Sequence, residues 1–233
     1  MPLPLLRQAM GALPNCQFYQ GYGMTELSPL ATVLFPEDHR FENVDRDFAP
    51  VKSAGKPVVG VEVRVVDAQD RDMPVGQAGE VIARGPNVMK GYWNRPEINA
   101  EVLRGGWMHT GDIGAFDEEG FLYLLDRKKD MIKTGSENVY SPEVESTVCA
   151  HPAVLEAAVI GIADERWGEA VRAVVAVRPG AKLTETELIE WCRGRLTHFK
   201  CPTSVVFTES LPKGGTGKIQ KTALRELYGA AVH

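Results

Sequence analysis

The hydrophobic pattern of this chain changes at a short charged segment, "DRKKD" (residues 126–130), and no other feature constrains the fold as much. Before it, "VEVRVVDAQ" (residues 61–69) alternates valines with polar residues, which is typical of a half-buried strand. "GEVIARG" (residues 79–85) follows a glycine-rich turn and is expected to be its partner. Residues 55–125 therefore predict short strands joined by turns, in a small barrel or sandwich.

After the charged segment, helical and strand patterns alternate. "YSPEVESTVCAHP" offers Ser141 as the N-cap of one helix, and Thr184 with Glu187 predicts the capping box of another. Three apolar segments predict strands: residues 155–163, 169–180 and 203–211. This alternation is typical of a compact α/β domain. The predicted fold class is α/β (α+β), a β-rich part followed by a small α/β domain, with the boundary between residues 1–128 and 129–233.

Composition limits the partners and the compartment. The 233 residues include 26 Lys+Arg against 31 Asp+Glu, so nothing suggests a nucleic-acid partner. The four cysteines form no Cys-x-x-Cys pair, which argues against a zinc site or a disulfide framework and favours a reducing, cytoplasmic compartment. No apolar run approaches the ~20 residues that span a bilayer. The N-terminus has no signal-peptide pattern and is similar to the middle of a helix, so we expect a piece of a longer protein.

A glycine- and lysine-rich segment, "PKGGTGK", lies near the end of the sequence. A Walker-type phosphate loop needs glycine where Pro212 stands and serine or threonine where Ile219 stands, so that motif is absent. A nucleic-acid patch would prefer a basic chain with aromatic residues among the charges. We therefore expect a flexible glycine loop that presents Lys218 and leads into a helix. Lys213 and Lys221 fit ordinary solvated lysines.

Five motifs occur in order over nearly the whole chain: "GYGMTE" (21–26), "GEVIARGPNVMKGYWNRP" (79–96), "GWMHTGD" (106–112), "DRKKDMIKTGSENVYSPEVE" (126–145) and "PKGGTGK" (212–218). Together they resemble the adenylate-forming acyl-CoA ligases. The resemblance implies that a fatty or similar carboxylic acid is joined to AMP, with ATP and magnesium, and is then passed to coenzyme A. It also implies that the first part belongs to the large AMP-binding domain and the second is the small lid domain.

The first motif is implied to bind the nucleotide. Gly21 and Gly23 would let the backbone approach the base, and Tyr22 would lie against the adenine. Thr25 would hydrogen-bond the α-phosphate, and Glu26 would ligate magnesium, a hard cation suited to carboxylate oxygen. By itself the motif also fits a surface loop whose Thr-Glu caps a helix, but its four companions favour the nucleotide site.

Three further residues are implied to serve the adenylation step. Asp112 resembles the carboxylate that accepts both ribose hydroxyls, and Arg127 would also reach the ribose. Lys218 resembles the lysine that bridges the substrate carboxylate and the α-phosphate, and such a preorganised cation contributes ~100- to 1,000-fold in rate. His109 receives no role, because a lone histidine is more often structural. The stretch at 79–96 is taken as a scaffold marker without chemistry.

The thioester step is implied to use another face of the small domain, so this domain would have to turn between the two steps. Lys129 resembles the residue at which the family's hinge lies. The residues that resemble the coenzyme A channel and its contacts are Gly135, Ser136, Glu137, Trp167, Phe199 and Lys200. The family commonly has a second glycine where Ser136 stands. A core tryptophan and a helix-end aromatic are equally good accounts of Trp167 and Phe199.

Two parts of the family pattern do not occur in these 233 residues: the Ser/Thr/Gly-rich loop that grips the β- and γ-phosphates, and most of the acyl pocket. We therefore expect the chain by itself to be inactive, and the acid remains unspecified. Two other functions stay open. One is an adenylation unit that loads a carrier protein, and the other is a non-catalytic nucleotide-binding fragment. A homo-oligomer is also left open.

Overall fold

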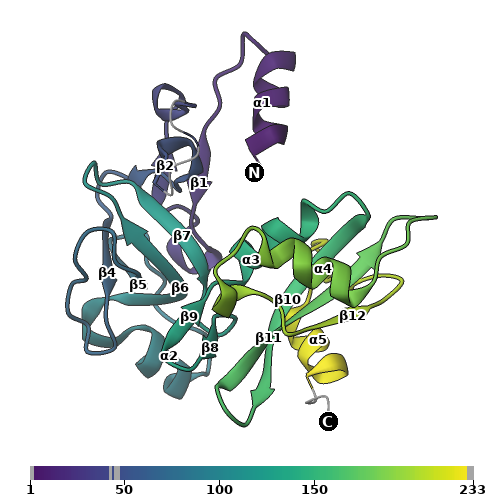
Figure 1. The fold of residues 1–233 in the computed structure, drawn as a ribbon. Helices are drawn as coiled ribbons and strands as arrows, with labels where there is room; N and C mark the ends of the chain where they lie inside the picture. The colour runs from purple at the N-terminus through teal and green to yellow at the C-terminus, as the bar shows by residue number, and fades with distance from the viewer. Residues whose placement is uncertain (1–2, 42–43, 45–47, 230–233) are drawn as a thin grey trace. The chain divides into compact units, whose positions relative to one another are not determined.

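The computed structural model describes residues 3–41, 44 and 48–229, and the chain divides into two compact units, Met1–Leu125 and Asp126–His233 (Figure 1). The sequence pattern places the boundary after residue 128, whereas the division by packing falls after Leu125. No helix in the described part of the chain has both the length and the apolarity that crossing a bilayer requires.

The first unit contains two sheets. The strands of the smaller sheet are β1 (Gln20–Tyr22), β2 (Thr32–Leu34) and β3 (Lys56–Pro57). The larger is a meander of β4 (Glu62–Val66), β5 (Gly79–Arg84), β6 (Met108–Phe116) and β7 (Leu122–Arg127). The helical segments are α1 (Leu3–Ala12), α2 (Pro96–Val102) and the short 3₁₀ turns η1 (Thr25–Leu27), η2 (Pro36–Asp38), η3 (Pro50–Lys52) and η4 (Arg104–Gly106). The predicted strands and their antiparallel pairing are thus present.

The two sheets of the first unit share a buried core. Leu34 of β2 packs with Phe121, which directly precedes β7, and with Tyr123 in β7. The chain also joins the sheets through its backbone, because the Leu122 N–H donates to the Gly55 carbonyl oxygen at 2.9 Å. The Ala54 N–H likewise donates to the Leu122 carbonyl oxygen at 2.7 Å, so the two sheets meet at their edges as well as through side chains.

The second unit is a five-stranded sheet with helices on both faces. Its strands are β8 (Ile132–Thr134), β9 (Glu137–Val139), β10 (Val154–Asp164), β11 (Gly168–Val177) and β12 (Ser204–Phe207). Its helices are α3 (Ser141–Cys149), α4 (Glu185–Arg193), α5 (Lys221–Tyr228) and the 3₁₀ turn η5 (His198–Lys200). The central strand β11 is antiparallel to β10 and β8 and parallel to β12.

Alternation along β11 explains the two layers of helices. Val171, Ala173 and Val175 belong to a core with residues of α3 and α4, whereas Val174 belongs to a second core with Leu224 of α5. Successive strand residues point to opposite faces, so the continuously apolar residues 173–177 of β11 need cover on both. The predicted α/β architecture is therefore confirmed.

One of the two predicted helix caps is wrong. The Thr184–Glu187 capping box is present at the start of α4. Helix α3 instead begins at Ser141 itself, which makes no side-chain cap. The N–H and the Oγ of Ser141 both donate to Oδ2 of Asp126 at 2.7 Å. The hydroxyl thus donates to a carboxylate 15 residues earlier in the sequence, and local capping rules do not predict such a partner.

Candidate functional site

The "GYGMTE" motif begins in β1 and ends in the turn η1. The Ala31 N–H donates to the Tyr22 carbonyl oxygen at 2.8 Å, which closes the loop. Leu27, the last residue of η1, is completely buried and forms a core with Ala31. Thr25 and Glu26 therefore occupy a short turn whose next side chain is anchored in the interior.

The glycines of this motif are required by the packing of the loop. A Cβ added at Gly21 would lie 2.6 Å from Cδ1 of Leu30. A Cβ added at Gly23 would collide with the carbonyl oxygen of Pro29, a backbone atom that cannot move aside. The steric demand visible at these glycines thus comes from the chain itself and not from a base.

A β-bulge presents Asp112 in the "TGD" motif. Glu80 pairs with Ile113 and Ile82 pairs with His109, so one residue of β5 faces three residues of β6. Gly111 has φ +70° within this bulge, with open space where a Cβ would lie, so glycine is needed there for its conformation. Bulges of this kind re-aim a side chain away from the regular ladder.

The structure joins the first and third motifs through one hydrogen bond. The Tyr22 hydroxyl donates to Oδ2 of Asp112 at 2.7 Å, and Asp112 is only 7% exposed. These residues are 90 positions apart in sequence. An aromatic ring and a carboxylate acceptor, the two groups expected to bind a base and a ribose, therefore lie together in the first unit.

Glu26 is held by a residue that the sequence analysis gave no role. The Tyr92 hydroxyl donates to Oε1 of Glu26 at 2.6 Å, and this hydrogen bond is the largest cause that raises the pKa of Tyr92 to about 12. No cluster of three or more His, Cys, Asp or Glu side chains suited to a metal occurs among the described residues. Glu26 nevertheless fits magnesium, which proteins usually bind through one or two carboxylates together with phosphate oxygens and water.

The stretch at 79–96, expected to be scaffold, supports the "GYGMTE" loop at further points. Nδ2 of Asn87 donates to the carbonyl oxygens of Leu27 and Leu30 at 2.8 and 2.9 Å. The Met89 N–H donates to the Glu26 carbonyl oxygen at 2.8 Å. These partners are about 60 residues apart, so no local sequence signal indicates them.

His109 lies in a charged cluster on the same strand as Asp112. Its Nδ1 is 3.4 Å from Oε2 of Glu80, and its side chain is 4% exposed. Arg104 Nη2 lies 3.7 Å from the same oxygen and 3.0 Å from Oδ1 of Asp70. These contacts support the expectation that His109 has a structural role.

In the second unit, Lys218 lies at the end of a closed hairpin. The Gly214 N–H donates to the Lys218 carbonyl oxygen at 2.8 Å, and the Gln220 N–H donates to the Pro212 carbonyl oxygen at 2.9 Å. Gly217, with φ +78°, makes the turn. Lys218 is exposed, so the hairpin presents its amine to solvent.

Of the two neighbouring lysines expected to be solvated, Lys213 is exposed, with a side chain 46% exposed, whereas the expectation is wrong for Lys221. Lys213 forms an ion pair with Glu156, which holds the pKa of that carboxyl below its usual value, chiefly through the hydrogen bond from the lysine. Lys221 has a side chain only 16% exposed, and its amine lies 2.7 Å from Oε1 of Glu145.

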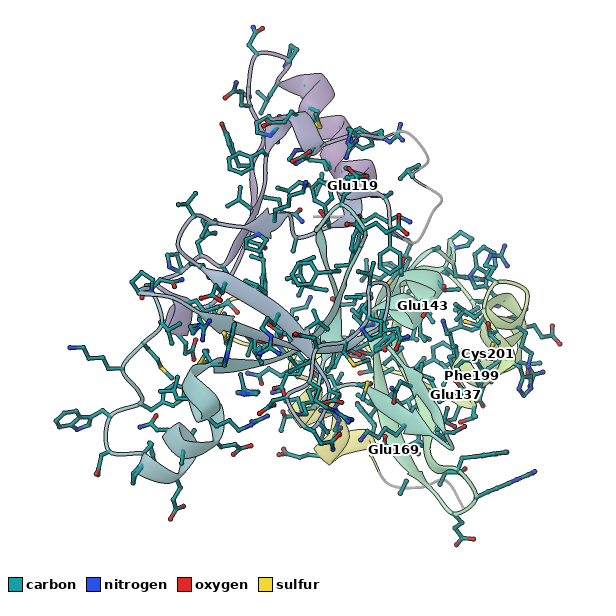
Figure 2. The ribbon with its side chains drawn as sticks, turned by 90° about the vertical axis from the view of Figure 1, so that its left-hand side faces the viewer. Glu119, Glu137, Glu143, Glu169, Phe199 and Cys201 are labelled. Carbon is teal, nitrogen blue, oxygen red and sulfur yellow. The ribbon has the colours of Figure 1, made fainter. Side chains whose placement is uncertain are left out.

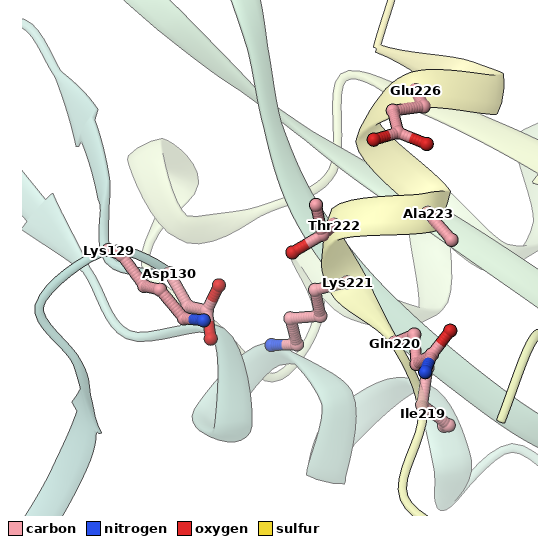
Figure 3. Close-up of a pocket in the computed structure, with 8 residues that line it drawn as sticks. All are labelled: Lys129, Asp130, Ile219, Gln220, Lys221, Thr222, Ala223 and Glu226. Atoms are coloured by element: carbon pink, nitrogen blue, oxygen red, sulfur yellow. The ribbon is translucent and has the colours of Figure 1, made fainter. Parts of the chain in front are cut away.

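Arg127 and Lys129, the expected ribose contact and hinge, flank a tight turn. The Arg127 carbonyl oxygen accepts the N–H groups of Asp130 and Met131, both at 2.9 Å. Lys129 and Asp130 also line a cleft of about 490 Å³ whose other wall is the start of α5 (Figure 3).

Two of the residues expected at the coenzyme A channel meet in the structure. The Gly135 N–H donates to the Trp167 carbonyl oxygen at 2.7 Å, and a Cβ on Gly135 would lie 3.1 Å from the Trp167 ring. Trp167 is 49% exposed in the turn between β10 and β11, so a core tryptophan is the wrong account of it. Ser136 and Glu137 are exposed on the same loop.

Phe199 and Lys200 lie in η5, which contacts β9. Both carboxylate oxygens of Glu143 accept from the Lys200 amine, at 2.7 and 2.8 Å. Phe199 is partly buried against the core of the second unit. Figure 2 shows Glu137, Glu143 and Phe199 in this part of the second unit.

Family models match both units. The model of the AMP-binding enzymes matches residues 1–93, and that of the AMP-binding enzyme C-terminal domain matches residues 143–218, ending at Lys218. The chain belongs to the adenylate-forming enzyme family. Its relatives within this family include acyl-CoA and aryl-CoA ligases, and solved structures of the family share its fold.

Three relatives illustrate the similarity. A feruloyl-CoA synthase from Amycolatopsis sp. is 45% identical over 212 residues, covering 91% of this chain and 42% of the relative. A long-chain-fatty-acid–CoA ligase from Escherichia coli O6:H1 is 44% identical over 207 residues, covering 89% and 35%. The o-succinylbenzoate CoA synthetase of Bacillus subtilis with its acyl-adenylate intermediate has a TM-score of 0.84 at 35% identity, covering 99% of this chain and 45% of that chain.

The same enzyme has been solved with ATP and a magnesium ion, with a TM-score of 0.82 at 35% identity, covering 97% of this chain and 44% of that chain. The chain thus spans less than half the length of these adenylate-forming relatives.

Proposed function

We propose that the full-length protein, meaning this chain with the additional length that its relatives have, is an AMP-forming acid–thiol ligase. In the first half-reaction a carboxylate oxygen attacks the α-phosphorus of ATP and pyrophosphate leaves. In the second, the sulfur of coenzyme A attacks the acyl carbonyl and AMP leaves. The relatives' names support a carboxylic acid as substrate, and they range from aromatic acids to long-chain fatty acids.

The hydrogen bond between Tyr22 and Asp112 is the observation that carries this proposal. An aromatic ring held beside a carboxylate by this bond supports a site that takes a purine and a ribose. An ionised carboxylate can accept from both hydroxyls of a ribose. Gly21 and Gly23 shape the loop, Thr25 faces the α-phosphate, and Arg127 contributes a second ribose contact.

Glu26 is the proposed magnesium ligand, oriented by Tyr92. A ligand carboxylate that is itself hydrogen-bonded is held in place, and such outer partners are usual at metal sites. Magnesium would neutralise the phosphate oxygens and so stabilise the charge that develops as pyrophosphate leaves.

Lys218 is the proposed catalytic cation of the first half-reaction. Its hairpin is closed by backbone hydrogen bonds, so the amine is carried on a short segment of defined shape. Preorganised cations of this kind contribute roughly 100- to 1,000-fold. The loop of Gly135, Ser136 and Glu137 with Trp167 and, beyond it, Phe199 and Lys200 is the proposed coenzyme A surface.

The test is to assay both half-reactions of the full-length protein. ATP–pyrophosphate exchange is measured with a panel of aromatic and long-chain fatty acids, and thioester formation is measured separately from synthetic acyl-adenylate. We expect Lys218→Ala to slow exchange by roughly 100- to 1,000-fold and to leave thioester formation near the parent rate. Equal loss in both half-reactions would contradict the role of Lys218.

The same assay separates the alternatives. Thioester on a holo-carrier protein but not on coenzyme A would identify a carrier-loading adenylation unit. ATP binding without acid-dependent exchange would identify a non-catalytic nucleotide-binding protein. The 233-residue chain by itself serves as a comparison, and we expect it to give little exchange because its sequence holds no loop for the leaving pyrophosphate.

A further inference from the structure

Lys221 is a charged residue that the structure largely shields from solvent. Its side chain is 16% exposed, whereas Lys218, three residues earlier, is exposed. Removing an ammonium group from water is costly unless opposite charge and hydrogen bonds compensate. The amine is compensated by the carboxylate of Glu145 and by a hydrogen bond to Oγ of Ser141, both on α3.

The partners of Lys221 are themselves fixed. Oε1 of Glu145 also accepts the N–H of Val159 in β10 at 2.9 Å. Oγ of Ser141 donates to Asp126, the first residue of the second unit, at 2.7 Å. The start of α5 is therefore tied to a helix, to the sheet and to the chain just before the expected hinge.

The rest of α5 is held on the same side. Arg225, one turn after Lys221, forms an ion pair with Asp130 at 2.7 Å. Leu224 is fully buried in the core beneath the helix. Figure 3 shows Lys221 extending from the start of α5 toward the turn that holds Lys129 and Asp130.

The other end of the Lys218 hairpin is tied to β10 as well. Lys213 pairs with Glu156, and Oε1 of Glu156 also accepts the Leu211 N–H at 3.2 Å. The hairpin thus lies between two lysine–glutamate pairs: Glu156 is a residue of β10, and Glu145 accepts a hydrogen bond from Val159 of the same strand.

We propose that Lys221 is a positioning residue for Lys218. Its ion pair with Glu145 fixes the base of the hairpin on α3 and β10, so that the Lys218 amine is presented from a rigid support. This inference rests on the proposed function, in which Lys218 contacts the reacting groups. Misplacing a catalytic group by about 1 Å can reduce the rate roughly 100-fold, so a support of this kind bears on adenylation.

The first measurement tests the anchor without activity. In the 233-residue chain, we expect Lys221→Met to accelerate amide hydrogen exchange at Gly214, Gly217 and Gln220 by about tenfold. Lys221→Arg should restore slow exchange because it keeps the cation. Lys182→Met, which changes an exposed lysine of the same unit, is the matched control. Unchanged exchange in Lys221→Met would overturn the proposal.

The second measurement tests positioning in the full-length protein. We expect Lys221→Met to lower kcat of ATP–pyrophosphate exchange roughly 10- to 100-fold, with the KM for ATP nearly unchanged and thioester formation from synthetic acyl-adenylate retained. Glu145→Gln should act in the same direction, and Lys221→Arg should recover most of the rate. Two outcomes would overturn the proposal. One is ATP–pyrophosphate exchange at the parent rate in a variant whose hairpin amides exchange faster. The other is equal loss in both half-reactions together with a lower Tm. If the parent protein forms no adenylate, the proposed function fails, while hydrogen exchange still decides whether Lys221 anchors the hairpin.

Discussion

Tyr92 shows how a single residue outside the expected site can organise it. The phenol donates to Glu26, and its raised pKa of about 12 keeps it protonated throughout the range in which such an enzyme would be assayed. The hydroxyl is therefore a hydrogen-bond donor to Glu26 throughout that range. The orientation of the proposed magnesium ligand should depend on this hydroxyl.

We expect Tyr92→Phe in the full-length protein to raise the magnesium concentration that half-saturates ATP–pyrophosphate exchange by roughly tenfold, because outer partners of metal ligands typically contribute that much or more. A magnesium titration at saturating ATP measures it. Trp93→Phe is the control, since Trp93 is adjacent and 96% exposed. An equal effect of both variants would mean that the magnesium dependence reflects the conformation of the loop and not the hydrogen bond from Tyr92 to Glu26.

At the scale of elements, the Lys218 hairpin and strand β10 are joined by a charge pair that responds to pH. Lys213 lowers the pKa of Glu156 below its usual value of 4.5. A carboxyl with a depressed folded-state pKa stabilises the fold above its unfolded pKa, and this contribution is lost as the pH falls through the folded value. The pair therefore contributes at pH 7, and its contribution decreases as the pH is lowered through the folded-state pKa of Glu156.

We expect Lys213→Met to lower the free energy of unfolding by roughly 0.5–1 kcal/mol at pH 7, the range for a largely solvated pair. At pH 3 the difference between the parent and the variant should be smaller than at pH 7, because Glu156 takes up protons as the pH falls. Urea unfolding of the 233-residue chain at both pH values measures this. A difference of the same size at both pH values would show that the lysine acts through its packing and not through its charge.

At the scale of the whole molecule, the division into two units matters because the two half-reactions are assigned to different loops of the second unit. Lys218 and the loop of Gly135 lie on separate segments, and we propose that a rotation lets them serve one site in turn. The proposed hinge, Lys129, lies in the turn closed by the Arg127 carbonyl oxygen, just after the division at Leu125.

We expect Lys129→Pro in the full-length protein to keep much of its adenylation rate and to lose thioester formation, because proline fixes φ near −65° and prevents the turn from changing its conformation. The two half-reactions are measured separately. Lys128→Pro is the matched control in the same turn and should retain both. Thioester formation at the parent rate by Lys129→Pro would place the hinge elsewhere.

The sequence by itself determined the class of fold, the family motifs and most of the elements. The alternation in β4, the apolar run in β11 and the Thr184–Glu187 box are local patterns. Local patterns are set by the period of each element and by hydrogen bonds within a few residues. The candidate residues came from motifs, which fix residue types but not contacts.

Only the tertiary structure decided which side chains meet. The bond from Tyr22 to Asp112, the support of Glu26 by Tyr92, the recruitment of Ser141 by Asp126 and the burial of Lys221 against Glu145 all join distant segments. The environment of a charge depends on its burial and its partners, and these arise only when the elements pack. For this reason Lys221, an ordinary lysine in the sequence, became the best-anchored cation next to the proposed catalytic loop.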